Sequence, residues 1–223
     1  MALGGTMITI WGGATTRTLR VHWACHELGL TYRSELIGSR TGATQTDSFR
    51  ALNAKEKIPV LVDGDFVLTE SAAIIAYLAD CYGAPEQLAP LAGTRERAVY
   101  DQWVSFVLME LDAHTLYVIR KHRDLAALYG EAPAAIDTAI AGFQKQVRVA
   151  EIHLENEYAS GRKGYVVGDR FSGADILLTG VLAWAEIYAV PFGPTLLRYL
   201  NQNRARPAFR SASKHNFSIK TGG

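Results

Sequence analysis

The residues with the clearest chemical potential lie in one stretch of nineteen, from Asn53 to Ser71. Ile58-Pro59 lies near its start, and X-Pro is the only kind of peptide bond whose cis form is easily populated. Thr69-Glu70-Ser71 ends it, with a carboxylate and a hydroxyl before the helix-forming run Ala72–Ala79. Backbone groups beside the proline and side chains at the helix start would face one small pocket. Such a pocket suits a peptide-like anion.

A second polar segment, Gly12–Thr18, lies between a predicted strand and a predicted helix. It places hydroxyl groups and one cation at the positive N-terminus of that helix. Such a helix start could activate the thiol of a bound molecule. A thiol attacks as the thiolate, and a free cysteine thiol has a pKa of about 8.5. Lowering this pKa by two units requires about 2.7 kcal/mol of preferential thiolate stabilisation. A hydroxyl donor and the helix terminus can supply it, because hydrogen bonds to charged groups contribute roughly 1.5–3 kcal/mol.

The elements that carry these segments follow the order βαβ–ββα, the thioredoxin-like arrangement. Apolar residues spaced by four and three, Val21, Cys25 and Leu28, predict the first helix, and apolar runs around Asp63-Gly64-Asp65 predict a hairpin. The expected elements are a strand Met7–Trp11, a helix Thr18–Leu28, a strand Thr31–Ile37, a short helix Thr46–Leu52, a hairpin of Val60–Val62 with Phe66–Leu68, and a helix from Ser71 to near Gly83.

The rest of the chain is predicted to be helical. Gly83–Pro90, with two prolines and no periodicity, is the expected linker. Apolar faces predict one helix from Arg95 to about Lys121 and another that begins at Pro133. We therefore expect an α/β thioredoxin-like domain over residues 7–84 and an all-α helical domain over residues 92–216.

Bulk composition excludes several classes of protein. The chain has 223 residues, of which 48% are hydrophobic and 20% charged, ordinary values for a soluble globular protein. A net charge of +1 gives no general attraction to nucleic acid or to anionic membranes. No apolar run has the length of a membrane span, and no signal-peptide pattern opens the chain. Two cysteines provide no disulfide framework, which fits a reducing cytoplasm.

Together the two polar segments and their elements resemble the cytosolic glutathione transferase family. The likeness covers most of the chain and is strongest from Thr9 to Leu78. The resemblance implies that the bond before Pro59 is cis and that the backbone of Ile58 pairs with the cysteinyl part of glutathione. It also implies that Glu70 and Ser71 bind the γ-glutamyl end.

The same resemblance extends to the glycyl end of glutathione and to the co-substrate in general. Lys57 matches a position that often contacts the glycyl carboxylate. Thr44 and Gln45 lie near other carboxylate contacts of the family and stay open as further contacts. Glutathione is thus the expected co-substrate, and no metal is expected.

The thiolate partner is expected in the loop before the first helix. Thr15 matches the activating serine of serine-type members, Thr16 follows it, and Arg17 falls where some members carry cysteine. Tyrosine-type members need a phenol near Trp11-Gly12, which this chain lacks. The threonine methyl restricts its rotamer, so Thr15, Thr16, Arg17 or backbone donors alone remain candidates. A purely structural capping role for the threonines is compatible with each of these.

Other reactive residue types are better explained by structure. Cys25 lies on the apolar face of the first helix and is expected in the core. Cys81 lies outside the two polar segments, so disulfide exchange is disfavoured. His22 and His26 share a helix face but lack the third ligand of a zinc site. Asp175 stands three residues after Ser172, the spacing of a capping box, and is expected to support folding.

The expected reaction is attack of glutathione thiolate on a small hydrophobic electrophile, a detoxification chemistry. By resemblance, four residues of the helical domain line the electrophile pocket: Trp103, Phe106, Val107 and Glu110. Ordinary core packing is an alternative for each aromatic. Peroxide reduction, isomerisation and reductive dehalogenation use the same thiolate and stay open, as does a non-catalytic glutathione-binding module. Family members are usually homodimers, so a homodimer in the cytoplasm is expected.

Overall fold

The computed structural model describes residues 7–84 and 87–219, and the chain divides into two compact units. The first unit contains the described residues up to Leu91 together with those from Arg204 onward. The second unit spans Ala92–Asn203. Residues 85 and 86 of the expected linker lie outside the described residues.

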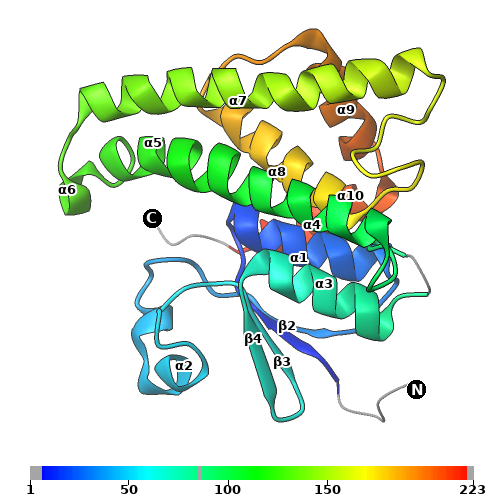
Figure 1. Cartoon of the computed structure of the whole chain (residues 1–223). Helices are drawn as coiled ribbons and strands as arrows, with labels where there is room; N and C mark the ends of the chain where they lie inside the picture. Colours follow the sequence, from blue (N-terminus) through cyan, green and yellow to red (C-terminus); the bar gives the residue numbers. More distant parts are fainter. Residues whose placement is uncertain (1–6, 85–86, 220–223) are drawn as a thin grey trace. The chain divides into compact units, whose positions relative to one another are not determined.

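The first unit is built on a mixed sheet, which has four strands in the order β2-β1-β3-β4 within the described residues (Figure 1). β1 pairs parallel with β2 and antiparallel with β3, and β3 pairs antiparallel with β4 across the predicted hairpin. The strands are β1 (Thr9–Trp11), β2 (Arg33–Glu35), β3 (Val60–Asp63) and β4 (Phe66–Thr69). The helices are α1 (Thr16–Glu27), the 3₁₀ turn η1 (Ala43–Gln45), α2 (Asp47–Leu52), α3 (Ser71–Tyr82) and α10 (Pro207–Asn216). The expected thioredoxin-like α/β domain is confirmed.

The C-terminal helix α10 belongs to the first unit, although it was expected in the helical domain that runs to residue 216. It packs on α1, where the rings of Trp23 and Phe209 meet edge to face with centroids 4.9 Å apart. Arg206 Nε and Nη2 donate to the two carboxylate oxygens of Glu27 at 2.6 and 2.7 Å. This fork-shaped ion pair and the ring contact explain why α10 groups with α1.

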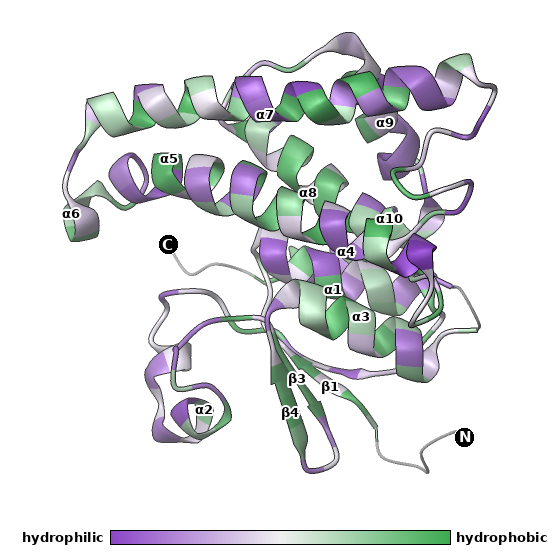
Figure 2. Cartoon of the chain, in the orientation of Figure 1, coloured by the Kyte–Doolittle hydropathy of each residue, from purple (hydrophilic) through white to green (hydrophobic). Residues whose placement is uncertain are grey.

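The second unit is entirely helical within its described residues. Its elements are α4 (Arg95–Phe106), η2 (Val107–Leu116), α5 (Tyr117–His122), α6 (Ala126–Tyr129), α7 (Pro133–Ala159), α8 (Gly173–Ile187) and α9 (Pro194–Arg204), the last residue of which is assigned to the first unit. Figure 2 shows that α8 is hydrophobic along most of its length, and twelve of its residues are buried. A helix that is apolar on most sides forms the centre of a helical unit.

Asp175 is confirmed as a structural residue at the start of α8. Its carboxylate is fully buried and accepts hydrogen bonds from the Ser172 backbone at 2.8 Å, from the Val166 backbone at 3.0 Å and from the Tyr199 hydroxyl at 2.8 Å. Ser172 completes the predicted capping box. The carboxylate therefore joins the loop before α8 and helix α9 to the N-terminus of α8.

The helix predicted from Arg95 to about Lys121 is confirmed in extent, since α4, η2 and α5 follow one another without a break, but its central turns are not regular α-helix. Its central part, η2, is π-helical, while α4 and α5 on either side are regular α-helix. The Thr115 hydroxyl donates to the Leu111 carbonyl at 2.6 Å inside this stretch. A side chain that bonds the preceding turn in this way competes with the regular ladder and favours such an irregularity. Among the described helices, none has the length and apolarity to span a bilayer.

Candidate functional site

Strand pairing brings the predicted site segments to one edge of the sheet. Trp11, at the end of β1, pairs with Val60, the first residue of β3, and Val60 pairs with Thr69, the last residue of β4. The segments Gly12–Thr18, Lys57–Pro59 and Glu70–Ser71 therefore leave or enter the sheet at the same edge. All three segments lie within the first unit.

The segments Gly12–Thr18 and Lys57–Pro59 approach each other closely at Gly12. It has a φ of +119°, and a Cβ there would lie 2.6 Å from Thr18 Cγ2 and 2.7 Å from Ile58 Cβ. Real Cβ atoms do not make such contacts, so only glycine fits between the start of α1 and the proline loop.

The proline loop has the geometry that the sequence implied. The Ile58-Pro59 bond is cis. Asn53, which is 6% exposed, braces the loop: its Nδ2 donates to the Lys57 carbonyl at 2.7 Å, and its Oδ1 accepts the Lys55 N–H at 3.1 Å. The sequence analysis missed this role of Asn53. An asparagine shortly before X-Pro, which favours local turn bonding, was the available signal.

An apolar cluster holds the proline loop on the sheet. Phe49 of α2, Ile58 and Val60 are buried together, and the rings of Phe49 and Trp11 meet edge to face at 6.0 Å. Ile37 and Leu52 pack against the same cluster. The cluster fixes the backbone of Ile58, which would otherwise be free to move in a loop.

Glu70 and Ser71 stand at the start of α3. Glu70 has φ +71° and ψ 117°, a conformation that is costly for a residue with a side chain and that often marks a functional position. Its carboxylate is 2.5 Å from Lys55 Nζ, which also donates to Thr69 Oγ1 at 3.0 Å. Both charged side chains are exposed, so the ion pair adds little to folding stability. Lys55 was not predicted as a site residue, because its contact with Glu70 forms only through the hairpin.

Ser71 differs from Glu70 in that it is mostly buried, with 7% exposure. Its hydroxyl has no hydrogen-bond partner among the residues that the structure describes. The first N–H groups of α3 also lack intrahelical partners, as at any helix start. A hydroxyl and backbone donors at the positive end of a helix form an arrangement suited to a carboxylate.

Helix α1 begins two residues earlier than predicted, and Thr15 is its N-cap. Thr15 Oγ1 accepts the Thr18 N–H at 3.1 Å, and Thr18 Oγ1 accepts the Thr15 N–H at 3.2 Å. Thr16 and Arg17, both half-buried, form the first turn. The capping role that the sequence left open for the threonines is therefore real for Thr15. Capping uses only the oxygen of the Thr15 hydroxyl. Thr15 Oγ1 also lies 2.9 Å from Thr18 Oγ1, so the hydroxyl hydrogen can turn either to Thr18 or to a bound ligand.

The expected contacts with the glycyl end are spread over two segments. Lys57 has an exposed side chain immediately before the cis bond. Thr44 is buried in η1, with 3% exposure, whereas Gln45 beside it is exposed. Of the two open candidates, only Gln45 presents its side chain freely to solvent.

The four predicted electrophile residues lie on α4 and η2 of the second unit and differ in burial. Trp103 packs on His153 of α7, with ring centroids 4.8 Å apart, and on Phe106 at 5.7 Å. Val107 is fully buried, whereas Phe106 and Glu110 are half-buried. Trp103 and Val107 are thus core residues by burial.

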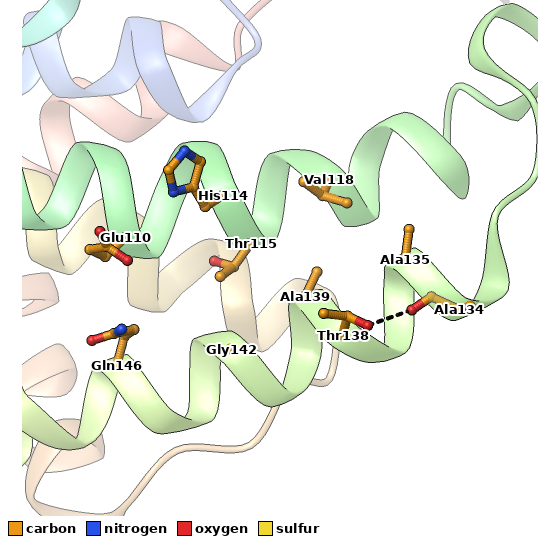
Figure 3. A pocket seen from close by; sticks show the side chains of 10 residues that line it. All are labelled: Glu110, His114, Thr115, Val118, Ala134, Ala135, Thr138, Ala139, Gly142 and Gln146. Carbon is orange, nitrogen blue, oxygen red and sulfur yellow. Dashed lines mark hydrogen bonds between the residues drawn. The ribbon is translucent and has the colours of Figure 1, made fainter.

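Glu110 lines a pocket of about 560 Å³ between η2, α5 and α7. Figure 3 shows Glu110 and Gln146 on opposite walls, with Thr115 and Thr138 farther along. Thr138 donates to the Ala134 carbonyl at 2.8 Å, drawn as the dashed line. Small residues of α7 leave the space open: Ala135, Ala139 and Gly142. This pocket lies wholly within the second unit.

The cysteines stand apart from the site edge. Cys25 is fully buried in α1, and burial raises the pKa of its thiol to about 12, so the residue is core as predicted. Cys81 is exposed on α3, and partial burial with nearby Asp80 and Asp63 raises the pKa of its thiol. Neither thiol is activated as a nucleophile.

His22 connects α1 to the loop at the site edge. Its Nε2 is 2.9 Å from the Gly12 carbonyl and its Nδ1 is 2.8 Å from the Tyr32 hydroxyl. A carbonyl only accepts, so Nε2 carries the hydrogen and Tyr32 donates to Nδ1. Burial lowers the pKa of His22 to about 4, helped by the nearby His215 and His26. Across the described ranges, no three acidic, histidine or cysteine side chains are grouped for metal binding.

Comparisons with known proteins agree with this geometry. Residues 16–81 match the family model described as "Glutathione S-transferase, N-terminal domain", and residues 108–207 match "Glutathione S-transferase, C-terminal domain". The chain is 32% identical over 211 residues to a "Probable maleylacetoacetate isomerase" of Vibrio cholerae serotype O1, covering 88% of this chain and 90% of that protein.

Two solved structures are similar to the chain. A theta class glutathione S-transferase from Xanthomonas axonopodis pv. citri, with glutathione bound, is 28% identical, with a TM-score of 0.72 and coverage of 94% of this chain and 98% of that one. A glutathione transferase homolog from Lodderomyces elongisporus, with two GSH per subunit, has a TM-score of 0.84 at 23% identity, covering 95% and 99% of the two chains. At that identity the second likeness supports the fold alone.

The free energy of unfolding should decrease as the pH is lowered from neutral toward 4, because of His22. The unfolded histidine binds a proton near pH 6.5, whereas the folded one does so only near 4, so the unfolded state binds more protons between these values. The contribution is fully present above pH 6.5 and is lost as the pH falls toward 4. The full loss is about 3 kcal/mol in the free energy of unfolding. Urea unfolding at pH 7.5, 6 and 5 measures the decrease, of which about 2 kcal/mol is expected by pH 5.

The matched control for this prediction is His22→Gln, because glutamine can donate to the Gly12 carbonyl but does not titrate. Its free energy of unfolding should depend less on pH than that of the wild type. A smaller slope remains, since the pKa of His26 is also lowered by burial. Equal slopes for the wild type and the variant would show that His22 does not titrate as described.

Proposed function

Because the chain belongs to the glutathione S-transferase family, we propose that it binds glutathione at the sheet edge and directs the thiolate at small hydrophobic electrophiles. The observation that carries the proposal is the meeting of three segments there. The start of α1, the cis-proline loop and the start of α3 lie at one edge through the pairing of Trp11, Val60 and Thr69. One edge thus offers two helix N-termini and an ordered extended backbone.

Glutathione would span this edge from α3 to the proline loop. Glu70 would bind its amino group and Ser71 its γ-glutamyl carboxylate, supported by the unpartnered Ser71 hydroxyl and the N-terminus of α3. The backbone of Ile58, next to Pro59, would pair with the cysteinyl residue as an added strand does. The exposed ammonium of Lys57 would attract the glycyl carboxylate.

The cysteinyl sulfur would then face the start of α1, where the thiolate is stabilised. Thr15 is the first candidate donor because its hydroxyl hydrogen is not used in capping. Arg17 could stabilise the thiolate by charge, and Thr16 by its hydroxyl, from the first turn of the same helix. The helix dipole adds to each of these.

The electrophile would contact the second unit through residues with accessible side chains. Phe106 and Glu110 meet this condition, since both are half-buried. Trp103 and Val107 are buried, so they would shape such a site by packing under it. We therefore propose direct contact for Phe106 and Glu110 and support for the other two.

A second candidate reaction is glutathione-dependent isomerisation. The similarity to a probable maleylacetoacetate isomerase, over 88% of this chain, favours it. In such a reaction the thiolate adds to a conjugated carbon–carbon double bond, the resulting single bond rotates, and elimination returns the thiolate. The same site residues would serve because the first step is again thiolate addition.

Assembly and location are proposed on the same basis. We propose a homodimer in the cytoplasm, supported by family membership and the reducing conditions that suit free cysteines and glutathione.

The reactions differ in what happens to glutathione, and this difference tests the proposal. Conjugation of chlorodinitrobenzene consumes one glutathione per product, isomerisation of a conjugated cis-diacid consumes none, and peroxide reduction yields glutathione disulfide. We expect enzyme-dependent adduct formation with matching loss of free thiol. Isomer formation without thiol loss would select the second candidate. Glutathione binding without turnover of any substrate would contradict the proposal and indicate a binding module.

Ser71→Ala should weaken glutathione binding more than tenfold. The variant removes a hydroxyl that would bond a carboxylate, and a charge-assisted hydrogen bond contributes roughly 1.5–3 kcal/mol. Isothermal calorimetry on the folded variant measures the change. Ser211→Ala, at an exposed serine of α10, is the matched control and should bind as the wild type does. Unchanged affinity in Ser71→Ala would remove the proposed site.

The thiolate donor can be identified by substitution in the first turn of α1. If Thr15 donates, Thr15→Ala raises the pKa of bound glutathione and lowers kcat at neutral pH, whereas Thr15→Ser keeps the hydroxyl with a freer rotamer and restores activity. If Arg17 is the partner, Arg17→Ala gives the larger rise. Titration of the thiolate absorbance near ~240 nm follows the pKa. No change in either alanine variant would assign the role to backbone donors.

A further inference from the structure

Asn216, the last residue of α10, holds the loop before α1 at three points. Its backbone carbonyl accepts the Ala14 N–H at 2.7 Å, its Oδ1 lies 2.6 Å from Thr18 Oγ1, and its Nδ2 lies 3.2 Å from the Thr15 carbonyl. Asn216 and Thr18 are fully buried. A buried amide with each of these groups paired is a fixed anchor, because breaking any pair leaves a polar group without water.

The orientation of the Asn216 amide follows from its partners. The Thr15 carbonyl can only accept, so the NH₂ group must face it and the amide oxygen must face Thr18. The Thr18 hydroxyl then donates to that oxygen, its shortest contact. Its own oxygen accepts the Thr15 N–H at 3.2 Å and lies 2.9 Å from Thr15 Oγ1. Without a ligand it therefore also accepts the Thr15 hydroxyl hydrogen, which turns from Thr18 to the sulfur when glutathione is bound.

The anchored loop is one that needs support. Ala14 has a φ of +55°, which is unfavourable for alanine, and its N–H is the group that bonds Asn216. Gly13 allows the close approach, because a Cβ there would lie 3.1 Å from the Asn216 carbonyl oxygen. The end of α10 thus holds the loop in a conformation that the loop residues do not favour by themselves.

We propose that Asn216 is a positioning residue for the reaction: through Ala14 and Thr18, it fixes the position of Thr15 Oγ1, from which the hydroxyl hydrogen reaches the bound sulfur. This inference rests on the proposed function, since it assumes that Thr15 faces the glutathione thiol. Asn216 itself does not touch the substrate. Its effect should appear in the stabilisation of the thiolate and not in the binding of the γ-glutamyl end, which belongs to α3.

The test is the pKa of enzyme-bound glutathione in two variants of the anchor. Asn216→Ala and Thr18→Val, the latter of nearly unchanged shape, should each raise this pKa by about 0.5 to 1 unit. With a wild-type pKa of about 6.5, that lowers the thiolate fraction at pH 6.5, and with it kcat, by about two- to sixfold. The KM for glutathione should change much less. Thr18→Ser, which keeps the hydroxyl, should recover most of the wild-type pKa.

The double variant separates a shared anchor from two independent effects. If Asn216 and Thr18 act through the same hydrogen bond, the combined pKa rise equals about that of the larger single variant. Full additivity of the two rises would contradict the proposed link.

Arg206→Gln is the matched control for α10. It breaks the ion pair with Glu27, so it loosens the same helix without touching Ala14, Thr15 or Thr18. It should lower the melting temperature and leave the bound-thiol pKa unchanged. If Arg206→Gln raised the pKa of bound glutathione as much as Asn216→Ala does, the effect would come from loosening α10 in general, and the positioning role of Asn216 would be contradicted.

The outcomes also distinguish this inference from the proposed function. A wild-type protein that does not lower the pKa of bound glutathione would overturn both. A lowered pKa in the wild type that stays the same in folded Asn216→Ala and Thr18→Val would overturn the positioning role alone.

Discussion

The antiparallel pairing of β3 with both β1 and β4 is the constraint on which the site depends. Val60 lies between Trp11 and Thr69, so the chain segments that precede and follow these residues are forced to one edge of the sheet. The helices α1 and α3 both begin at this edge, and their positive ends face the same region. Neither helix start alone would distinguish the protein from many others. Together with the cis-proline loop, they place two helix N-termini and an extended backbone at one edge of the sheet.

Three costly conformations surround this edge, and two of them have an identifiable support. Ala14, Glu56 and Glu70 have positive φ values. Ala14 is held by α10, and the loop containing Glu56 is held by Asn53 through the Glu56 N–H. Strained residues persist only where their surroundings determine them, and they concentrate at functional sites. The supporting residues are the buried Asn53 and Asn216, whose backbone carbonyls accept these N–H groups while their side-chain amides bond neighbouring residues.

Features that depend on residues close together in the sequence were predicted best. The hairpin followed from Asp63-Gly64 between apolar runs, and the capping box followed from the spacing of Ser172 and Asp175, because each depends on residues a few positions apart. The cis bond and the glutathione-site residues came from resemblance. The π-helical turns of η2 were not predicted, since a threonine inside an apolar helical pattern gives no sign that it will bond the preceding turn.

Contacts between distant segments could not be predicted from one sequence. Asn216 and Thr18 are 198 positions apart, and Lys55 meets Glu70 only once the hairpin has formed. The assignment of α10 to the first unit depends on Arg206 and Phe209, ordinary residues of an amphipathic helix until α1 is in place. Periodicity identifies which face of a helix is buried, but not which partner buries it.

The central claim is that bound glutathione places its sulfur at the start of α1. A crystal structure of the glutathione complex tests this most directly. The account predicts the sulfur within about 3.5 Å of Thr15 Oγ1, the cysteinyl backbone paired with Ile58, and the γ-glutamyl carboxylate on the Ser71 hydroxyl. Glutathione bound elsewhere, or bound at this edge with its sulfur turned away from the first turn of α1, would contradict it.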